Sequence, residues 1–91
     1  MTFEWSARKA AANLKKHRVA FEDAATVFLD PLAITFPDPD HEPEEPREIT
    51  IGHTKGGQLV FVSHCERGDR IRIISARSAT RSEREQHEEG V

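Results

Sequence analysis

The chain has 91 residues, enough for one hydrophobic core but too few for two, so we expect a single domain over residues 1–91. Its one cysteine, Cys65, excludes an internal disulfide, and no paired Cys/His spacing suggests zinc, which together favour a reducing compartment. The net charge of −3 argues against a nucleic-acid partner only if the charge is spread evenly, and it is not.

The first part of the chain predicts a short strand and two helices. Residues 3 to 5 alternate apolar and polar side chains, and Ser6 is a suitable N-cap for a helix that ends near His17. A second helix is expected over residues 21 to 28, and Asp30-Pro31 ends it. Four apolar residues of the first helix recur at helical spacing and are expected to face the core: Ala7, Ala10, Ala11 and Leu14.

The second part predicts a sheet and a last helix. A strand over residues 32 to 36 precedes a proline- and acid-rich surface loop over residues 37 to 46. Strands at residues 48 to 53, 58 to 65 and 70 to 77 are joined by short glycine-containing turns, which favours antiparallel pairing. Thr80 and Glu83 form a capping box that begins a polar helix over residues 81 to 88. The predicted fold is α+β, in the order β-α-α-β-β-β-β-α, with an antiparallel sheet packed against helices.

The charges are segregated along the chain. Residues 38 to 48 carry six carboxylates and one arginine, so the remainder is net basic, with Lys and Arg concentrated in residues 8 to 18 and 67 to 84. These basic patches could attract phosphates or could only keep the protein in solution, and the sequence favours neither. The first residues lack the apolar stretch of a signal peptide, and no run is long enough to span a membrane, so we expect a cytoplasmic protein.

The residues with catalytic potential are arginines and histidines. No phosphate loop, dinucleotide fingerprint, HExxH motif or nucleophile elbow is present. Metal-free RNA cleavage needs a group that removes a proton from a 2′-hydroxyl, a group that donates one, and a cation that holds the charged phosphate. Histidine can serve in both proton transfers near neutral pH, and arginine binds phosphate through two parallel hydrogen bonds.

Each of these residues also has a structural interpretation. His17 suits the last turn of a helix, where a cation meets the negative end of the helix dipole. His41 lies in the acidic loop and is expected to face water. His53 and His64 lie near strand ends, where a polar side chain could also simply face water. The last strand carries Arg70 and Arg72 on one side, which is also typical of an exposed sheet face. Arg77 is better placed, because anions commonly bind where a strand meets the start of a helix.

Three stretches of the sequence carry a family resemblance, and together they cover nearly the whole chain: FEWSARKAAANLKKHRVAFEDAATVFLDP, REITIG and LVFVSHCERGDRIRIISARSATRSERE. They resemble the BrnT family of toxins. The resemblance implies a RelE-like fold, ribonuclease activity that arrests growth, and neutralisation by a BrnA-type antitoxin with a ribbon-helix-helix DNA-binding domain. It also implies that the complex represses its own promoter through DNA contacts of the antitoxin. Because ribbon-helix-helix domains dimerise, we expect two toxins and two antitoxins in the complex.

Several family positions fall on residues of this chain. The Lys-His pair falls on Lys16 and His17, and Arg18 replaces the glycine that follows it in relatives. The arginine before the third strand falls on Arg47. The Ser-Ala-Arg and Glu-Arg motifs fall on residues 75 to 77 and 83 to 84. Relatives usually carry a tyrosine where this chain has His87, and the chain has no tyrosine.

The sequence therefore predicts a metal-independent endoribonuclease that needs no cofactor. The predicted catalytic residues are His17, Arg47, Arg77 and His87, with the arginines on the phosphate and the histidines sharing the proton transfers. The predicted RNA-binding residues are Lys16, Arg67, Arg81 and Arg84. The alternative is a non-catalytic module, whose polar last helix and basic strands bind a protein or nucleic acid without cutting it.

Overall fold

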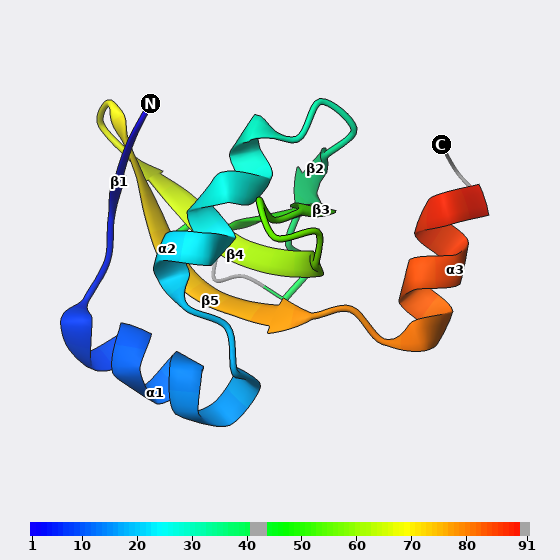
Figure 1. The fold of residues 1–91 in the computed structure, drawn as a ribbon. Helices are drawn as coiled ribbons and strands as arrows, with labels where there is room; N and C mark the ends of the chain where they lie inside the picture. Colours follow the sequence, from blue (N-terminus) through cyan, green and yellow to red (C-terminus); the bar gives the residue numbers. More distant parts are fainter. Residues whose placement is uncertain (41–43, 90–91) are drawn as a thin grey trace.

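The computed structural model describes residues 1–40 and 44–89, so the expectation for His41 lies outside the described residues. Three helices and a 3₁₀ segment pack with a five-stranded sheet whose strand order is β1-β5-β4-β3-β2 (Figure 1). The elements in chain order are β1 (Thr2–Glu4), α1 (Ala7–His17), α2 (Phe21–Ala24), η1 (Ala25–Leu29), β2 (Ile34–Pro37), β3 (Glu48–His53), β4 (Leu59–Arg67), β5 (Arg70–Ser78) and α3 (Arg81–Glu89). No helix of the described residues is long and apolar enough to cross a membrane.

The sheet is mixed, so the expectation of a wholly antiparallel sheet is wrong. Strands β2 to β5 form the predicted antiparallel meander, but β1 runs parallel to β5 and pairs Phe3 with Ile71. The helices between β1 and β2 carry the chain from one edge of the sheet to the other. A helical crossover of this kind permits parallel pairing, which a tight turn does not.

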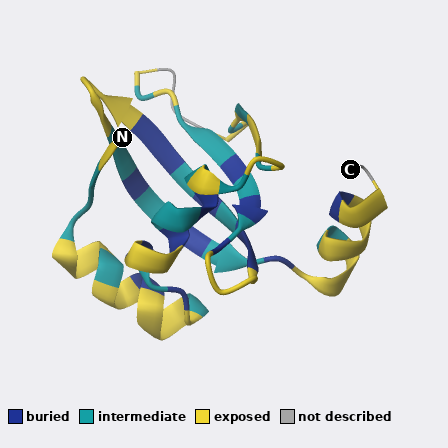
Figure 2. Ribbon diagram, turned by 45° about the horizontal axis from the view of Figure 1, so that its top comes forward, coloured by how far each residue is buried: buried dark blue, intermediate teal, exposed yellow. Residues whose placement is uncertain are grey.

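One face of the sheet is covered by α1, α2 and η1, and the main core lies between these elements and the sheet (Figure 2). The core residues are Val19, Phe21, Ala24, Val27, Val60, Val62, Ile73 and Ala76. The second predicted helix is α-helical only to Ala24 and continues as the tighter 3₁₀ form to Leu29. Such tightening is common at helix ends and here precedes the stop at Asp30-Pro31.

The inward face of α1 differs from the prediction. The buried residue of this helix is Asn13, whereas Ala7, Ala11 and Leu14 of the expected core stripe are exposed. Asn13 donates from Nδ2 to the carbonyls of Val19 (3.0 Å) and Ala76 (2.9 Å), and its Oδ1 accepts from the N–H of Ala76 (3.1 Å). The short strand β1 ends before this part of β5, so the amide of Asn13 supplies the hydrogen bonds that a neighbouring strand would have made.

A bulge shifts the register between β4 and β5. Near the turn Cys65 pairs with Arg72, but beyond the shift at Ser63 and His64 the pairs become Ser63 with Ser75 and Phe61 with Arg77. Ile74 is the additional residue of β5. Because side chains alternate between the two faces of a strand, one extra residue reverses the faces of all residues that follow it.

Helix α3 lies beyond the end of β5, to one side of the sheet and of the other helices (Figure 1). Its predicted capping box is present: Glu83 N–H donates to Thr80 Oγ1 (3.2 Å), and Glu83 Oε1 accepts from Thr80 N–H (2.9 Å). Apart from His87, which is buried, and the half-buried Glu83, its residues are exposed (Figure 2). A few polar and ring contacts therefore hold this helix.

The exit from α1 generates a first prediction. Arg18 adopts the left-handed conformation, with φ 60° and ψ 30°, and its N–H donates to the Leu14 carbonyl (2.9 Å). Glycine occupies this conformation without the penalty that a side chain meets. We expect Arg18→Gly to stabilise the fold by about 0.5–1 kcal/mol, because part of the gain is offset by the greater freedom of glycine in the unfolded chain.

Urea denaturation of the wild type and the variant measures this difference. The control is Arg18→Ala, which keeps a Cβ and should bring no such gain. Equal stabilisation by alanine and glycine would show that the backbone conformation is not the cause.

Candidate functional site

Three of the four predicted catalytic residues meet in one hollow. His17, Arg47 and Arg77 line a cavity of about 310 Å³ on the face of the sheet opposite α2. The remaining lining residues are Asp38, Asp40, Ile49, Phe61, Ser63, Ser75 and Ala76. These side chains come from the end of α1, from the segment between β2 and β3, from β3 itself, and from the centre of β4 and β5.

The hydrogen bonds of Asn13 bring His17 and Arg77 together. His17 lies one helical turn after Asn13 and is the last residue of α1. Ala76, which Asn13 binds through both its N–H and its carbonyl, directly precedes Arg77. The bulge at Ile74 then directs Arg77 to the same face as Phe61, so the two residues face each other across β4 and β5. The amide of Asn13 and the bulge at Ile74 thus position the imidazole of His17 and the guanidinium of Arg77.

The guanidinium of Arg77 is held on two sides. Its Cζ atom lies 4.4 Å from the centre of the Phe61 ring, a cation–π contact. Its Nη1 and Nη2 atoms donate to the two carboxylate oxygens of Glu83 at 2.8 and 2.9 Å. These bonds hold the pKa of Glu83 at about 2 and raise the pKa of Arg77. Glu83 uses one edge of the guanidinium, so the Nε–H is left for another acceptor.

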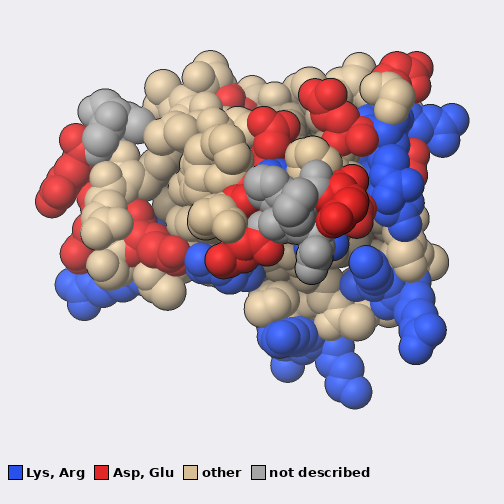
Figure 3. All heavy atoms as spheres, turned by 180° about the vertical axis from the view of Figure 1, so that it is seen from behind, with Lys and Arg blue, Asp and Glu red and all other residues tan. Residues whose placement is uncertain are grey.

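Carboxylates also lie close to the other arginines of this face. Glu45 lies 3.9 Å from Arg47 and 3.2 Å from Arg67, and Asp38 and Asp40 line the hollow itself. Figure 3 shows acidic side chains over the middle of this face and basic side chains below and to one side. A phosphate that enters the hollow must therefore compete with carboxylates of the same chain.

The predicted RNA-binding residues lie around the hollow or apart from it. Lys16 lines an adjoining hollow that shares His17 and Ser75 with the first. Arg67 is at the end of β4 and does not line the hollow; its guanidinium lies 3.2 Å from Glu45, which also lies near Arg47. On α3, Arg81 pairs with Glu85 at 3.2 Å, and Arg84 donates to the carbonyl of Ala79 at 3.1 Å.

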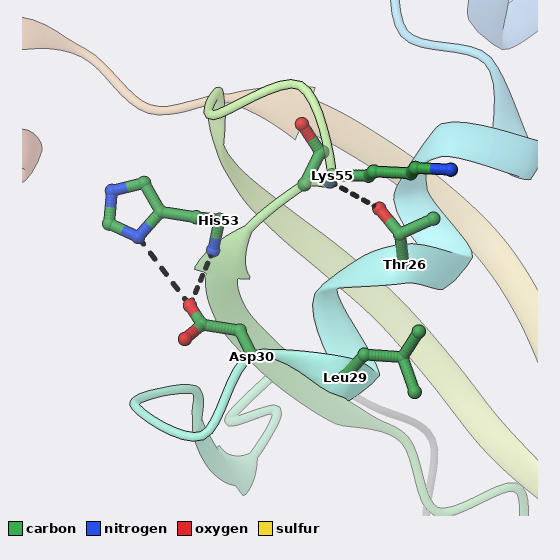
Figure 4. A pocket seen from close by; sticks show the side chains of 6 residues that line it. Thr26, Leu29, Asp30, His53 and Lys55 are labelled. Carbon is green, nitrogen blue, oxygen red and sulfur yellow. Dashed lines mark hydrogen bonds and ion pairs between the residues drawn. The ribbon is translucent and has the colours of Figure 1, made fainter.

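His87 does not line the hollow. It is buried on α3, where its ring centre lies 5.7 Å from that of His53, and its Nε2 finds no hydrogen-bond partner among the described residues. His53 in turn faces Asp30: its N–H donates to Oδ2 at 2.8 Å, and its Nδ1 lies 3.5 Å from the same oxygen (Figure 4). The backbone N–H of His53 lowers the pKa of Asp30. The structure therefore places His87 in a second cluster, away from the other three residues.

Another histidine has a structural role that the sequence did not predict. The sequence allowed His64, near a strand end, to face water or to take part in catalysis, but it is buried against the ring of Phe28. Its Nε2 hydrogen-bonds the hydroxyl of Thr50 at 2.7 Å, and Thr50 hydrogen-bonds Thr35 at 2.7 Å. Burial lowers the pKa of His64, which keeps the ring neutral at physiological pH.

Sequence reasoning missed Phe61 as a residue of the site and Glu83 as the partner of Arg77. The hairpin turn after Arg67 was recognised, but counting back from it without the bulge pairs Phe61 with Ala76 instead of Arg77. The sequence places Glu83 in the capping box and in the Glu-Arg motif of the family, but neither predicts that its carboxylate binds both Thr80 and Arg77. A residue that satisfies a strong local motif gives no sequence signal of a second, long-range contact.

The fold and the hollow define a small α+β protein in which an imidazole and two guanidinium groups line one hollow on the sheet. The family model for BrnT, described as the ribonuclease toxin of a type II toxin-antitoxin system, matches residues 5–83, and the chain belongs to this family. Its structure is similar to the crystal structure of the ribonuclease toxin BrnT of Brucella abortus, with a TM-score of 0.70 and 26% identity over 89% of this chain and 99% of that one. No curated protein matches the chain significantly by sequence.

The contact between Arg77 and Glu83 generates a second prediction. Glu83 has a pKa of about 2 in the folded protein against 4.5 in its ordinary state, so its contribution to stability is present above pH 4.5 and is lost as the pH falls towards 2. We expect Glu83→Gln to lower the free energy of unfolding at pH 7 by about 1–2 kcal/mol, a value reduced for partial solvent screening.

The loss should shrink progressively between pH 4.5 and 2. Thermal unfolding across this pH range measures it. Glu85→Gln is the matched control, since the Arg81–Glu85 pair is exposed and should contribute less than about 0.5 kcal/mol. A pH-independent difference between Glu83→Gln and the wild type would contradict the assignment.

Proposed function

We propose that this protein is an endoribonuclease toxin that cleaves RNA without a metal ion, with His17, Arg47 and Arg77 at the centre of its active site. The observation that carries the proposal is that these three residues, from separate parts of the chain, line one hollow. Membership of a family of ribonuclease toxins supplies the reaction class. The chemistry of the three side chains matches the needs of that reaction.

In the proposed reaction His17 removes the proton from the 2′-hydroxyl of the RNA. The 2′-oxygen then attacks the adjacent phosphorus, and the bond from phosphorus to the 5′-oxygen breaks. Arg47 and Arg77 bind the phosphate oxygens and stabilise the charge that develops on them. The leaving oxygen takes its proton from water, because His87, the predicted second proton-transfer residue, does not line the hollow.

Around this centre we propose a basic path for the RNA backbone. Lys16 is well placed for it, since its hollow adjoins the first. Arg67, Arg81 and Arg84 extend the proposed path, although Arg67 and Arg81 now pair with carboxylates and would have to exchange them for phosphates. A polyanion with several phosphates favours that exchange because it binds at many positions together.

We further propose the finer features of the toxin-antitoxin system. The partner is a BrnA-type antitoxin with a ribbon-helix-helix domain, two copies of each protein form the complex, and only the antitoxin contacts operator DNA. The toxin acts in the cytoplasm, where cleavage of RNA arrests growth. A RelE-like ancestry of the fold belongs to the same proposal. Support comes from the type II toxin-antitoxin family to which the chain belongs.

The third prediction tests the reaction itself. Purified toxin, free of any partner, should cut a labelled RNA in EDTA, and His17→Ala or Arg77→Ala should lower the rate by about 10²–10⁴-fold. The matched control is His53→Ala, which removes an imidazole outside the hollow and should stay within a few-fold of the wild type. Circular dichroism establishes that each variant is folded.

Three outcomes would contradict the proposal. A wild-type protein that shifts the mobility of RNA without cutting it would be the non-catalytic binding module. Loss of cleavage in EDTA with recovery in Mg²⁺ would make the reaction metal-dependent. A loss in His87→Ala as large as that in His17→Ala would assign a proton transfer to His87 in place of water.

A further inference from the structure

Helix α1 has two flanks of different chemistry. At about 3.6 residues per turn, the side that faces the sheet contains Asn13 and His17. Lys9 and Lys16 lie on one flank, where they line the hollow that adjoins the active site. Ala7, Ala11 and Leu14 lie on the other flank, nearly opposite the two lysines. The helix therefore separates a surface suited to RNA from an apolar one.

The apolar flank is open to solvent. Leu14 is 49% exposed, and with Ala11, Lys15 and Arg18 it lines a shallow hollow of about 690 Å³. None of these four residues lines the proposed active site. Exposure of one leucine needs no explanation, but here it continues a stripe that the helix could have turned towards the core. Asn13 occupies the inward position instead, so the stripe is left for another contact.

The spacing of this flank suits a helical partner. Ala7, Ala11 and Leu14 follow each other at intervals of four and three residues, the spacing of the ridges through which helices pack. The two alanines have short side chains, so the backbone of a second helix can approach closely. Leu14 supplies a larger apolar side chain at the end of the stripe, of the kind that fills a gap between the residues of a partner helix.

The charges around the flank identify the partner's chemistry. Residues 7 to 18 contain five Lys or Arg and no Asp or Glu. Arg8, Lys15 and Arg18 belong to the same helix and its end as the apolar stripe. By contrast, the arginines at positions 47, 67, 72, 77 and 81 each have a carboxylate of this chain nearby. A basic rim with no acidic residue in its own helix favours an acidic partner.

We propose that the flank formed by Ala7, Ala11 and Leu14 binds an amphipathic helix of the antitoxin, with apolar side chains on the stripe and carboxylates beside Lys15 and Arg18. This inference rests on the proposed function in one respect, namely that an antitoxin binds this toxin. Binding there would leave the hollow with His17, Arg47 and Arg77 uncovered by the helix itself. The antitoxin would inhibit through the rest of its chain or through steric exclusion of a large RNA.

A second exposed apolar group is the alternative docking site. Leu29, Leu32 and Ile34 are 80%, 55% and 46% exposed and lie beside the open edge of the sheet at β2. The open edge would suit an extended segment better than a helix. The residues flanking this group do not form a basic rim like that of α1, since Lys55 and Asp30 both line the neighbouring hollow. We therefore place the antitoxin helix on α1 and use this group as the control.

The fourth prediction tests the assignment by calorimetric titration. The probe is the purified protein encoded by the reading frame next to that of the toxin, and the full-length toxin is used throughout. We expect Leu14→Glu to raise the Kd about tenfold or more, since it places a charge at the centre of the contact. Leu29→Glu, the same substitution at an exposed leucine elsewhere, should change the Kd by less than about threefold.

Two further variants separate charge from packing and partner from RNA. Lys15→Glu should weaken binding and reduce its dependence on NaCl, because it reverses one of the proposed ion pairs. Lys16→Glu, one residue along on the opposite flank, should leave the antitoxin affinity nearly unchanged while it weakens RNA binding. Leu14→Glu should retain RNA cleavage. Because Leu14 and Lys15 are exposed, these variants should remain folded, with a thermal midpoint lowered only slightly by a carboxylate near the last turn of α1.

The results that would overturn the inference are distinct. Wild-type affinity in Leu14→Glu, or a loss only in Leu29→Glu, would place the partner elsewhere. Loss of RNA cleavage in Leu14→Glu with unchanged antitoxin binding would assign the flank to RNA, and a free toxin that dimerises through Leu14 would assign it to a second copy. If the wild-type toxin does not bind the protein encoded by the next reading frame, both this inference and the proposal of an antitoxin are overturned. Leu14-dependent binding by a toxin that cuts no RNA would sustain the inference and refute the proposed reaction alone.

Discussion

The site depends on one side-chain amide. Asn13 binds both backbone groups of Ala76 and the carbonyl of Val19, so it joins α1, the turn that follows it, and β5 at one point. Each of these bonds is buried, and an unpaired polar group at this position would cost about 1–3 kcal/mol. Without the amide, the edge of β5 beyond β1 would expose an unpaired N–H and carbonyl to the underside of α1. The hydrogen bonds between Asn13 and Ala76 therefore satisfy the edge of β5 and also fix the distance between His17 and Arg77.

The arginines of the proposed site have carboxylates of the same chain as partners. Glu83 holds Arg77 through two hydrogen bonds, and Glu45 lies near both Arg47 and Arg67. These contacts hold the guanidinium groups in place, and they also reduce the positive potential of the face. The acidic excess of the sequence is thus part of the same surface as the cations. Net charge alone is a poor guide to partners here, since the carboxylates and arginines lie within contact distance of each other.

Local signals in the sequence were sufficient for most element boundaries. Ser6 and the Thr80–Glu83 pair mark helix starts, and glycine-containing turns separate the strands of the meander. What the sequence could not supply was orientation. From the sequence a buried asparagine resembles a polar surface residue, because two of the three hydrogen bonds of Asn13 are made with Ala76, which is distant in the chain. The apolar stripe on α1 was assigned to the core for the same reason.

The same limit applies to the site. His17, Arg47 and Arg77 were selected for their chemistry and their place in family motifs, and the hollow contains all three. His87 was selected on the same grounds but packs against His53, which depends on how α3 leaves the sheet. The direction of that helix is set by Glu83 and Arg77, a contact between neighbouring elements that neither helical spacing nor strand alternation predicts.

The bulge at Ile74 accommodates one more residue in β5 than in the facing part of β4. If the two strands paired without it, the register beyond Ser63 would slip by one residue, Ala76 would come opposite Phe61, and Arg77 would turn inward towards Val60 and Val62. Removal of one residue between the hairpin turn and Arg77 would make the bulge unnecessary and would leave Arg77 opposite Phe61. In an alignment of relatives, a single-residue gap in this strand is therefore compatible with an outward arginine, whereas a single-residue insertion needs a second bulge to keep Arg77 opposite Phe61.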